Sequence, residues 1–215
     1  MTPAQPATPR KPDSSARREF RGWSDAAIEF FEQIELDNSK VFWAAHKDVY
    51  ETEVLEPMQA LLAELERDFG PGKVFRPYRD VRFSADKSPY KTNVAAHNRA
   101  GYISLSSEVL GVGSGLHMPS PDQLTRYRAA VAHERTGPEL VDLVRSLRKN
   151  HVEVGAQEVL KSAPRGYAKD HSRIDLLRHR GLTAWRQWPV GEWLSGPTPK
   201  RRIVEFLRAT TPLRK

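Results

Sequence analysis

Apolar residues recur at helical spacing at both ends of this chain, with a stretch of period two between them. Residues 24–36 and 38–69 are predicted to form amphipathic helices that Ser24 and Asn38 cap at their N-termini. Pro57 lacks the backbone donor that a helix interior needs, so it should kink or restart the second helix. Further helices are predicted at residues 122–131, 138–147, 174–180 and 200–209.

Between Val74 and His117 the apolar residues alternate, which predicts four β-strands at residues 74–83, 92–98, 102–107 and 110–117. Residues 183–188 are predicted to add an edge strand. Short turns between consecutive strands favour antiparallel pairing, and one face of the sheet should be covered by the helices. The expected fold class is therefore α+β, with an antiparallel β-sheet of about four to five strands covered by amphipathic helices.

The organisation predicted from composition is a single α+β domain at residues 20–210 with a tail at each end. Residues 1–19 are rich in proline, alanine and basic residues, have no apolar periodicity, and are expected to form a disordered basic tail. Residues 211–215 form a short C-terminal tail. No apolar run approaches the roughly 20 residues that cross a membrane, so we expect a cytoplasmic protein with no membrane partner. The sequence does not indicate an oligomeric state.

The formal net charge is +7, and the chain contains no cysteine. The absence of cysteine excludes disulfides, thiolate nucleophiles and cysteine-ligated clusters. No histidine pair has the spacing of a metal site, and no cofactor-binding motif is present. Because the charge favours anionic partners, the candidates are an anionic small molecule, a nucleic acid or an anionic surface.

Residues 79–92 concentrate more polar chemistry than any other stretch, and we call them the signature segment. The segment contains cations and hydroxyl groups suited to holding and orienting an anion; these candidate ligand-binding residues are Arg79, Arg82, Ser84, Lys87, Tyr90 and Lys91. If the protein is an enzyme, Asp80 or Asp86 is the candidate general base or metal-positioning carboxylate. The alternative is that both carboxylates neutralise neighbouring cations in a structural network of salt bridges.

Three further stretches contain recognisable motifs in addition to the signature segment. They are a helix with Asn38, Phe42, Trp43, Lys47 and Tyr50, a Gly-x-Gly strand that ends near His117, and an Ala-Pro-Arg-Gly-Tyr turn at residues 163–167. With these motifs the chain resembles the uncharacterised proteins grouped as domain of unknown function 2461, over about residues 20–210. The resemblance implies a shared fold and a shared site, and it brings no established activity.

Our hypothesis for function is a basic cleft that binds an anionic, phosphate-bearing small molecule. The signature segment would enclose this cleft together with a helix face formed by Trp43, Lys47 and Tyr50, and with a turn that carries Arg165. A nucleic-acid-binding protein is the first alternative, because tryptophans and tyrosines near basic residues can stack on bases. A non-enzymatic scaffold, in which the polar signature braces the fold, is the second.

One glycine pattern has a separate interpretation. Gly111, Gly113 and Gly115 alternate along a predicted strand, unlike a phosphate-binding loop, which joins a strand to a helix. Alternating glycines in a strand more often leave room for a neighbouring side chain or form a bulge, and we expect that role here.

Overall fold

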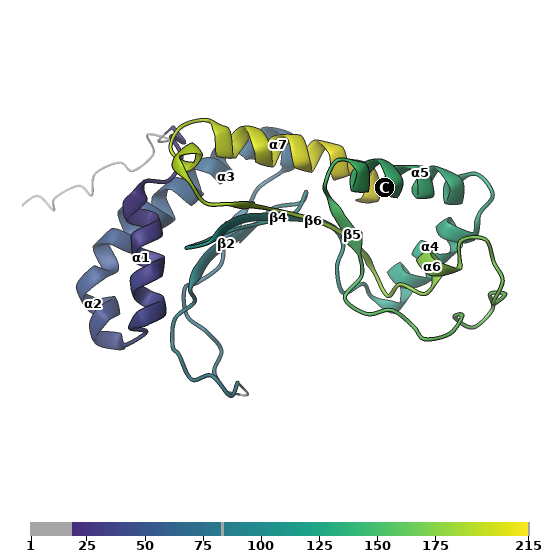
Figure 1. Cartoon of the computed structure of the whole chain (residues 1–215), viewed down its shortest axis with the longest axis horizontal. Helices are drawn as coiled ribbons and strands as arrows, with labels where there is room; N and C mark the ends of the chain where they lie inside the picture. Colours follow the sequence, from purple (N-terminus) through teal and green to yellow (C-terminus); the bar gives the residue numbers. More distant parts are fainter. Residues whose placement is uncertain (1–18, 83, 215) are drawn as a thin grey trace, which may run out of the picture.

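The computed structural model describes residues 19–82 and 84–214. The predicted disordered tail therefore lies, apart from Glu19, outside the described residues, as does Phe83 of the signature segment. Within the described chain the fold is α+β, as predicted, with one antiparallel sheet of six strands. The sheet lies in the middle of an elongated molecule, with helices beside it and at both ends (Figure 1).

The N-terminal part is a run of helices: α1 (Asp25–Leu36), α2 (Lys40–Val49), a π-helical stretch (Tyr50–Leu55) and α3 (Glu56–Phe69). Pro57 stands in the first turn of α3, so the helix restarts there after the π-helical stretch, as expected. Ser24 is the N-cap residue of α1, as predicted, but its hydroxyl makes no capping bond and donates to Glu53 Oε2 at 2.7 Å. The second predicted cap is wrong. Ser39, whose Oγ accepts from the backbone N of Phe42, caps α2 in place of Asn38.

The strands are β1 (Lys73–Val74), β2 (Asn93–His97), β3 (Tyr102–Ser106), β4 (Val109–Leu116), β5 (Glu153–Gly155) and β6 (Leu182–Pro189). They lie in the order β1-β2-β3-β4-β6-β5, with every neighbouring pair antiparallel. The predicted edge strand is β6, but the edge placement is wrong. The strand β5, which was not predicted, pairs outside it.

The predicted strand at residues 74–83 is also wrong over residues 75–82, and Phe83 lies outside the described residues. Residues 75–92, which we call the arm, leave the sheet and return to it, and one isolated bridge between Tyr78 and Tyr90 joins their two sides near the sheet. Pro77 and Pro89 flank this bridge, and neither can donate a backbone hydrogen bond, so a regular ladder cannot continue there. In Figure 1 the arm projects from the sheet at the end where α1 and α2 lie.

One face of the sheet is covered by helices and the other is not. Helices α3 and α7 (Thr198–Thr210) lie on the covered face (Figure 1). Burial alternates accordingly along β3, where Ile103 and Leu105 are buried while Tyr102 and Ser104 are partly exposed. The opposite face, which no described helix covers, is called the open face.

A helical lobe stands at the far end of the sheet. It contains α4 (Pro121–Ala132), α5 (Thr136–Lys149) and α6 (Ile174–Leu177), and short 3-10 helices follow β6 and α7 at Glu192–Leu194 and Thr211–Arg214. Arg173 holds the lobe together by donating to the carbonyl oxygens of Val131 and Ala132 at 2.7 and 2.9 Å. Among the described residues, no helix has both the length and the apolar character needed to cross a membrane.

Candidate functional site

Both arginines of the signature segment are paired inside the arm. Arg79 forms an ion pair with Asp86. Arg82 donates to Asp80 through two bonds, from Nε at 2.9 Å and from Nη2 at 2.7 Å. This two-pronged geometry is the one that guanidinium and carboxylate groups favour. The ion pairs that the scaffold alternative predicts are therefore present, and the arginine donors are directed to groups of the arm.

The two lysines of the signature segment are also directed inward. Lys87 Nζ donates to the carbonyl oxygen of Val81 at 3.0 Å, and Lys91 Nζ donates to that of Arg76 at 2.9 Å. Lys91 Nζ also lies 5.5 Å from the centre of the Phe75 ring. These contacts fix the shape of the arm, but carbonyl oxygens do not neutralise ammonium charges.

The carboxylates of the arm are weak bases. Hydrogen bonds from the Ser88 hydroxyl and backbone N, with a further bond from Arg79, lower the pKa of Asp86 to about 2. Hydrogen bonds from Arg82 lower the pKa of Asp80. A general base works best when its pKa lies near the operating pH, so the geometry of Asp80 and Asp86 favours bracing over proton transfer. Ser84 is partly buried in the same arm.

The arm is anchored to α2 at Tyr90. The Asn38 side chain accepts from the Tyr90 backbone N at 3.0 Å and donates to the Tyr90 carbonyl at 3.2 Å. The Tyr90 ring stacks on Trp43 with ring centres 4.3 Å apart, and Trp43 lies 4.9 Å from Tyr50. All three rings are buried, and burial, with a smaller effect of Tyr78, raises the pKa of Tyr50 to about 12.

Two other candidate ligand-binding residues lie away from this aromatic cluster. Lys47 faces solvent on α2, where it pairs with Glu51 at 3.4 Å. Arg165 is exposed on the turn after Pro164. Figure 1 places the loop that contains this turn at the end of the molecule with the helical lobe, opposite α1, α2 and the arm. The structure therefore brings the arm and the α2 face together but does not bring the Arg165 turn to them.

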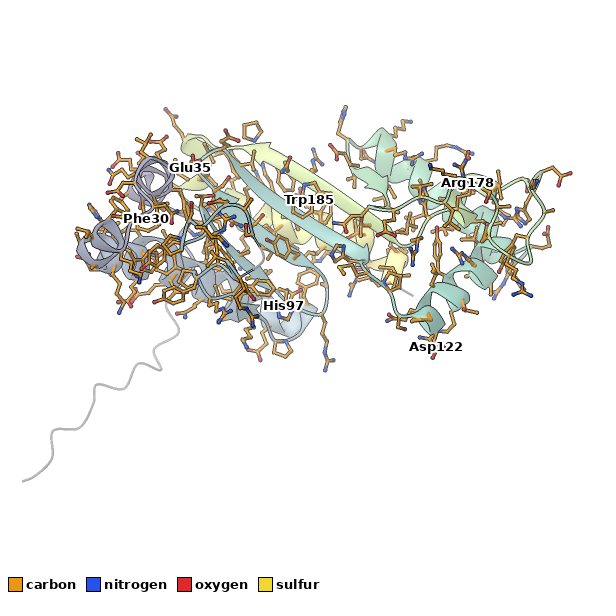
Figure 2. The ribbon with its side chains drawn as sticks, turned by 90° about the horizontal axis from the view of Figure 1, so that it is seen from below. Phe30, Glu35, His97, Asp122, Arg178 and Trp185 are labelled. Atoms are coloured by element: carbon orange, nitrogen blue, oxygen red, sulfur yellow. The ribbon has the colours of Figure 1, made fainter. Side chains whose placement is uncertain are left out.

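The open face carries a different set of side chains. One register line crosses all six strands and places one residue of each strand side by side: Lys73, His97, Tyr102, Gly113, Trp185 and Glu153. Phe75 continues the face beyond β1, with its ring centre 5.2 Å from that of His97 and 6.1 Å from that of Tyr102. Tyr102 and Trp185 are 5.9 Å apart. Figure 2, which views this side, shows Trp185 over the middle of the sheet and His97 toward one edge.

Glycines make room for the tryptophan in this row. A Cβ atom added to Gly113 would lie 2.4 Å from Trp185 Cε3, and one added to Gly111 would lie 2.7 Å from Cζ2. Both distances are shorter than real Cβ contacts, so the indole ring can lie over β4 only because these positions lack side chains. The expectation that the alternating glycines accommodate a neighbouring side chain is confirmed at Gly111 and Gly113, whereas at Gly115 the close neighbour is the backbone of β6.

A hollow of about 630 Å³ opens at the end of the open face that is nearest the helical lobe. It is lined by the turn between β2 and β3, the ends of β4 and β6, Gln157 and the C-terminal 3-10 helix. Its polar and aromatic lining residues include His97, Asn98, Arg99, Tyr102, Trp185 and Arg214. We call this cavity the turn hollow. A smaller hollow of about 230 Å³ adjoins it and shares the lining residues His117, Gln157 and Thr183.

Asn98 lines this hollow and has one donor group without a partner among the described atoms. Its Oδ1 accepts from the backbone N atoms of Ala100 and Gly101 at 2.8 and 3.0 Å, which fixes the orientation of the amide. Its Nδ2 is buried and bonds to no described atom, and the whole residue is only 8% exposed. An unpaired buried donor costs about 1–3 kcal/mol, so an acceptor brought by a ligand would be favoured.

Two exposed arginines stand beside Asn98. Arg214 donates from Nη1 to the carbonyl oxygen of Arg99 at 2.8 Å, which holds the C-terminal 3-10 helix against the turn. No salt bridge within the described chain involves Arg99 or Arg214, in contrast to the arginines of the arm. Among the described residues, no three histidine, aspartate or glutamate side chains gather in a group that could hold a metal ion.

Sequence reasoning missed Phe75, Asn98, Arg99, Tyr102 and Arg214. The sequence does indicate that the His97 and Tyr102 rings are neighbours, because these two residues flank a four-residue turn between two alternating segments. Residues that pair across such a turn lie on the same face of a sheet. For Arg214 the sequence offers no signal, since its position depends on how α7 returns along the sheet.

The fold and this hollow define a class: an α+β protein with one covered sheet face and one open, aromatic face. Residues 26–215 match the family described as conserved hypothetical protein DUF2461, and the chain belongs to that family. No significant match was found among curated proteins or among solved structures.

Proposed function

We propose that the protein binds an anionic, phosphate-bearing small molecule in the turn hollow. The observation that carries the proposal is a hollow of about 630 Å³ whose lining includes Asn98, a buried residue with an unpaired Nδ2 donor. Cavities of a few hundred Å³ with aromatic walls and a few fixed polar groups are the usual form of small-molecule sites. Tyr102 and Trp185 supply such walls here.

The charge beside the hollow supports an anionic ligand. The guanidinium groups of Arg99 and Arg214 belong to neighbouring segments that the bond from Arg214 to the Arg99 carbonyl holds together. Guanidinium groups present paired donors that fit phosphate oxygens, and the net charge of +7 attracts anions to the surface as a whole.

This proposal moves the ligand site away from the arm. The four cations of the signature segment already donate to groups of the arm, so releasing the arginines for a ligand would break the Arg79–Asp86 and Arg82–Asp80 pairs. Binding in the turn hollow would break no hydrogen bond of the Asn98 Nδ2 group, because that group has no partner among the described atoms. The arm then acts as a brace, and the ligand chemistry lies on the open face.

A thermal-shift screen of phosphorylated metabolites and nucleotides tests this function. A ligand at 100 times its Kd stabilises the folded state by about 2.7 kcal/mol, or roughly 5–10 °C in Tm for a chain of this size. We expect Arg99→Ala to remove most of that shift. Arg165→Ala, which removes another exposed arginine that does not line the hollow, is the matched control and should leave the shift unchanged.

A second variant separates binding from bracing. Arg82→Ala breaks a pair inside the arm, so we expect it to lower the Tm of the free protein while the ligand-induced shift stays the same. If Arg82→Ala abolishes the shift and Arg99→Ala does not, the ligand binds at the arm and the turn hollow is the wrong site. If no phosphorylated compound stabilises the protein, the proposed function fails.

A further inference from the structure

The aromatic row on the open face extends beyond the turn hollow. Phe75 does not line the hollow, yet its ring contacts those of His97 and Tyr102, and it is 40% exposed. Tyr102 in turn contacts Trp185, so the rings form one row across four segments of the sheet. A small molecule bound in the hollow would not contact Phe75. The row fits a longer ligand with several flat groups.

We propose that the open face binds single-stranded nucleic acid, with successive bases stacked on Phe75, Tyr102 and Trp185. Base stacking on aromatic side chains accepts any base, because every base has a π face. Neighbouring strands are about 4.8 Å apart, so the four steps from β1 to β6 span roughly 19 Å. That span matches the two or three bases that other open four-stranded sheets stack.

The charges around the row suit a phosphate backbone at the β1 edge. Lys73 begins the register line there, Arg76 is exposed next to Phe75, and Lys91 lies over the Phe75 ring. Glu153 ends the line at the opposite edge, on β5. The backbone should therefore approach on the side of β1 and turn away before β5. A duplex cannot use the row, because its bases are already stacked on one another.

The row itself is held in place by the sheet. The ring of Trp185 lies over Gly111 and Gly113, where any side chain would collide with it. The backbone N of Phe75 donates to the Ala95 carbonyl at 2.8 Å, which continues the pairing of β1 with β2 and fixes the first ring of the row. Rigid aromatic surfaces lose little entropy on binding, which favours affinity.

Fluorescence anisotropy of the full chain with a labelled ten-nucleotide oligouridine tests the inference. We expect saturable binding whose affinity falls with salt, at a slope of about −0.7 for each phosphate contacted in a single strand. Phe75→Leu keeps an apolar side chain but removes a stacking surface, and it should weaken binding about 5- to 100-fold. Phe42→Leu is the matched control, because Phe42 is also a partly exposed phenylalanine but lies on α2, and it should bind as the unmodified protein does.

Three results would overturn the inference: no measurable binding at low salt, equal affinity for Phe75→Leu and the unmodified protein, or tighter binding to a duplex of the same length. The last two would mean attraction by net charge alone. These results do not bear on the proposed function, which is tested with a small ligand and Arg99→Ala, whereas the present inference is tested with Phe75→Leu. Oligouridine binding that needs Phe75, with no small-molecule stabilisation, would refute only the turn-hollow proposal.

Discussion

The clearest stability prediction concerns Asn38→Ala, which removes the hydrogen bonds between the α1–α2 connection and the arm. The Asn38 side chain makes three bonds: to the carbonyl oxygens of Ile34 and Tyr90, both at 3.2 Å, and from the Tyr90 backbone N at 3.0 Å. Tyr90 is only 6% exposed, so its N–H and C=O groups would be left poorly solvated. Each such group costs about 1–3 kcal/mol, and we expect a total loss of roughly 2–4 kcal/mol.

Urea unfolding measures this loss, with Asn150→Ala as the matched control. Asn150 makes a single side-chain bond, to the Ser146 carbonyl at 2.9 Å, at the exposed end of α5. Its replacement should cost less than about 1 kcal/mol. Limited tryptic digestion supplies a second readout, because an arm released from α2 exposes its lysines and arginines to cleavage.

Equal destabilisation by the two asparagine variants would refute this reasoning. It would mean that the Tyr90 backbone groups find other partners, and that the stack of Tyr90 on Trp43 holds the arm without Asn38. Faster cleavage in the helical lobe than in the arm would refute it as well, since the lobe has no contact with this anchor in the described structure.

Two further predictions follow from single contacts. The pKa of Asp86 lies at about 2, below its ordinary value of 3.8, so its contribution to stability is complete above about pH 5 and is lost as the pH falls toward 2. The difference in Tm between the unmodified protein and Asp86→Asn should therefore close between pH 5 and about pH 2; a gap that does not change with pH would contradict the assignment. Gly113→Ala places a methyl group against Trp185 and should cost about 1–3 kcal/mol, measured by urea unfolding together with a changed near-ultraviolet circular dichroism spectrum. Gly155→Ala meets no atom within 4 Å and should be nearly neutral; equal costs would show that the indole ring does not rest on Gly113.

The apolar periodicity predicted most of the helices and strands, because the pattern of each element is contained in a few consecutive residues. The period of two from residue 92 to residue 117 identified β2, β3 and β4, since alternation reports a half-buried sheet directly. It failed at residues 75–82, where the alternation continues in the sequence but Pro77 and Pro89 prevent a ladder. It also missed β5, whose three residues are too few to show a period.

The candidate site was harder to predict because pairing between charges is not visible in a sequence. The signature segment was selected for its density of charge, and the same density lets Arg79 and Arg82 bond to Asp86 and Asp80 within a few residues. The turn hollow draws its residues from the β2–β3 turn, from β6 and from the C-terminal end of the chain. Tertiary folding alone brings these segments together, so no local motif marks them.

The braced arm still contributes charge to the proposed surface. Residues 75–92 contain three arginines and two lysines against two aspartates, which leaves a net charge of +3 after internal pairing. Because Lys87 and Lys91 donate to carbonyl oxygens, their charges stay uncompensated, and the Lys91 charge lies beside Phe75 at the start of the aromatic row. Such a field reaches about 10 Å at 0.1 M salt and raises the local concentration of anions. The arm can therefore attract an anionic partner to the open face without holding it, and the stacking and hydrogen-bonding groups of that face would then decide what binds.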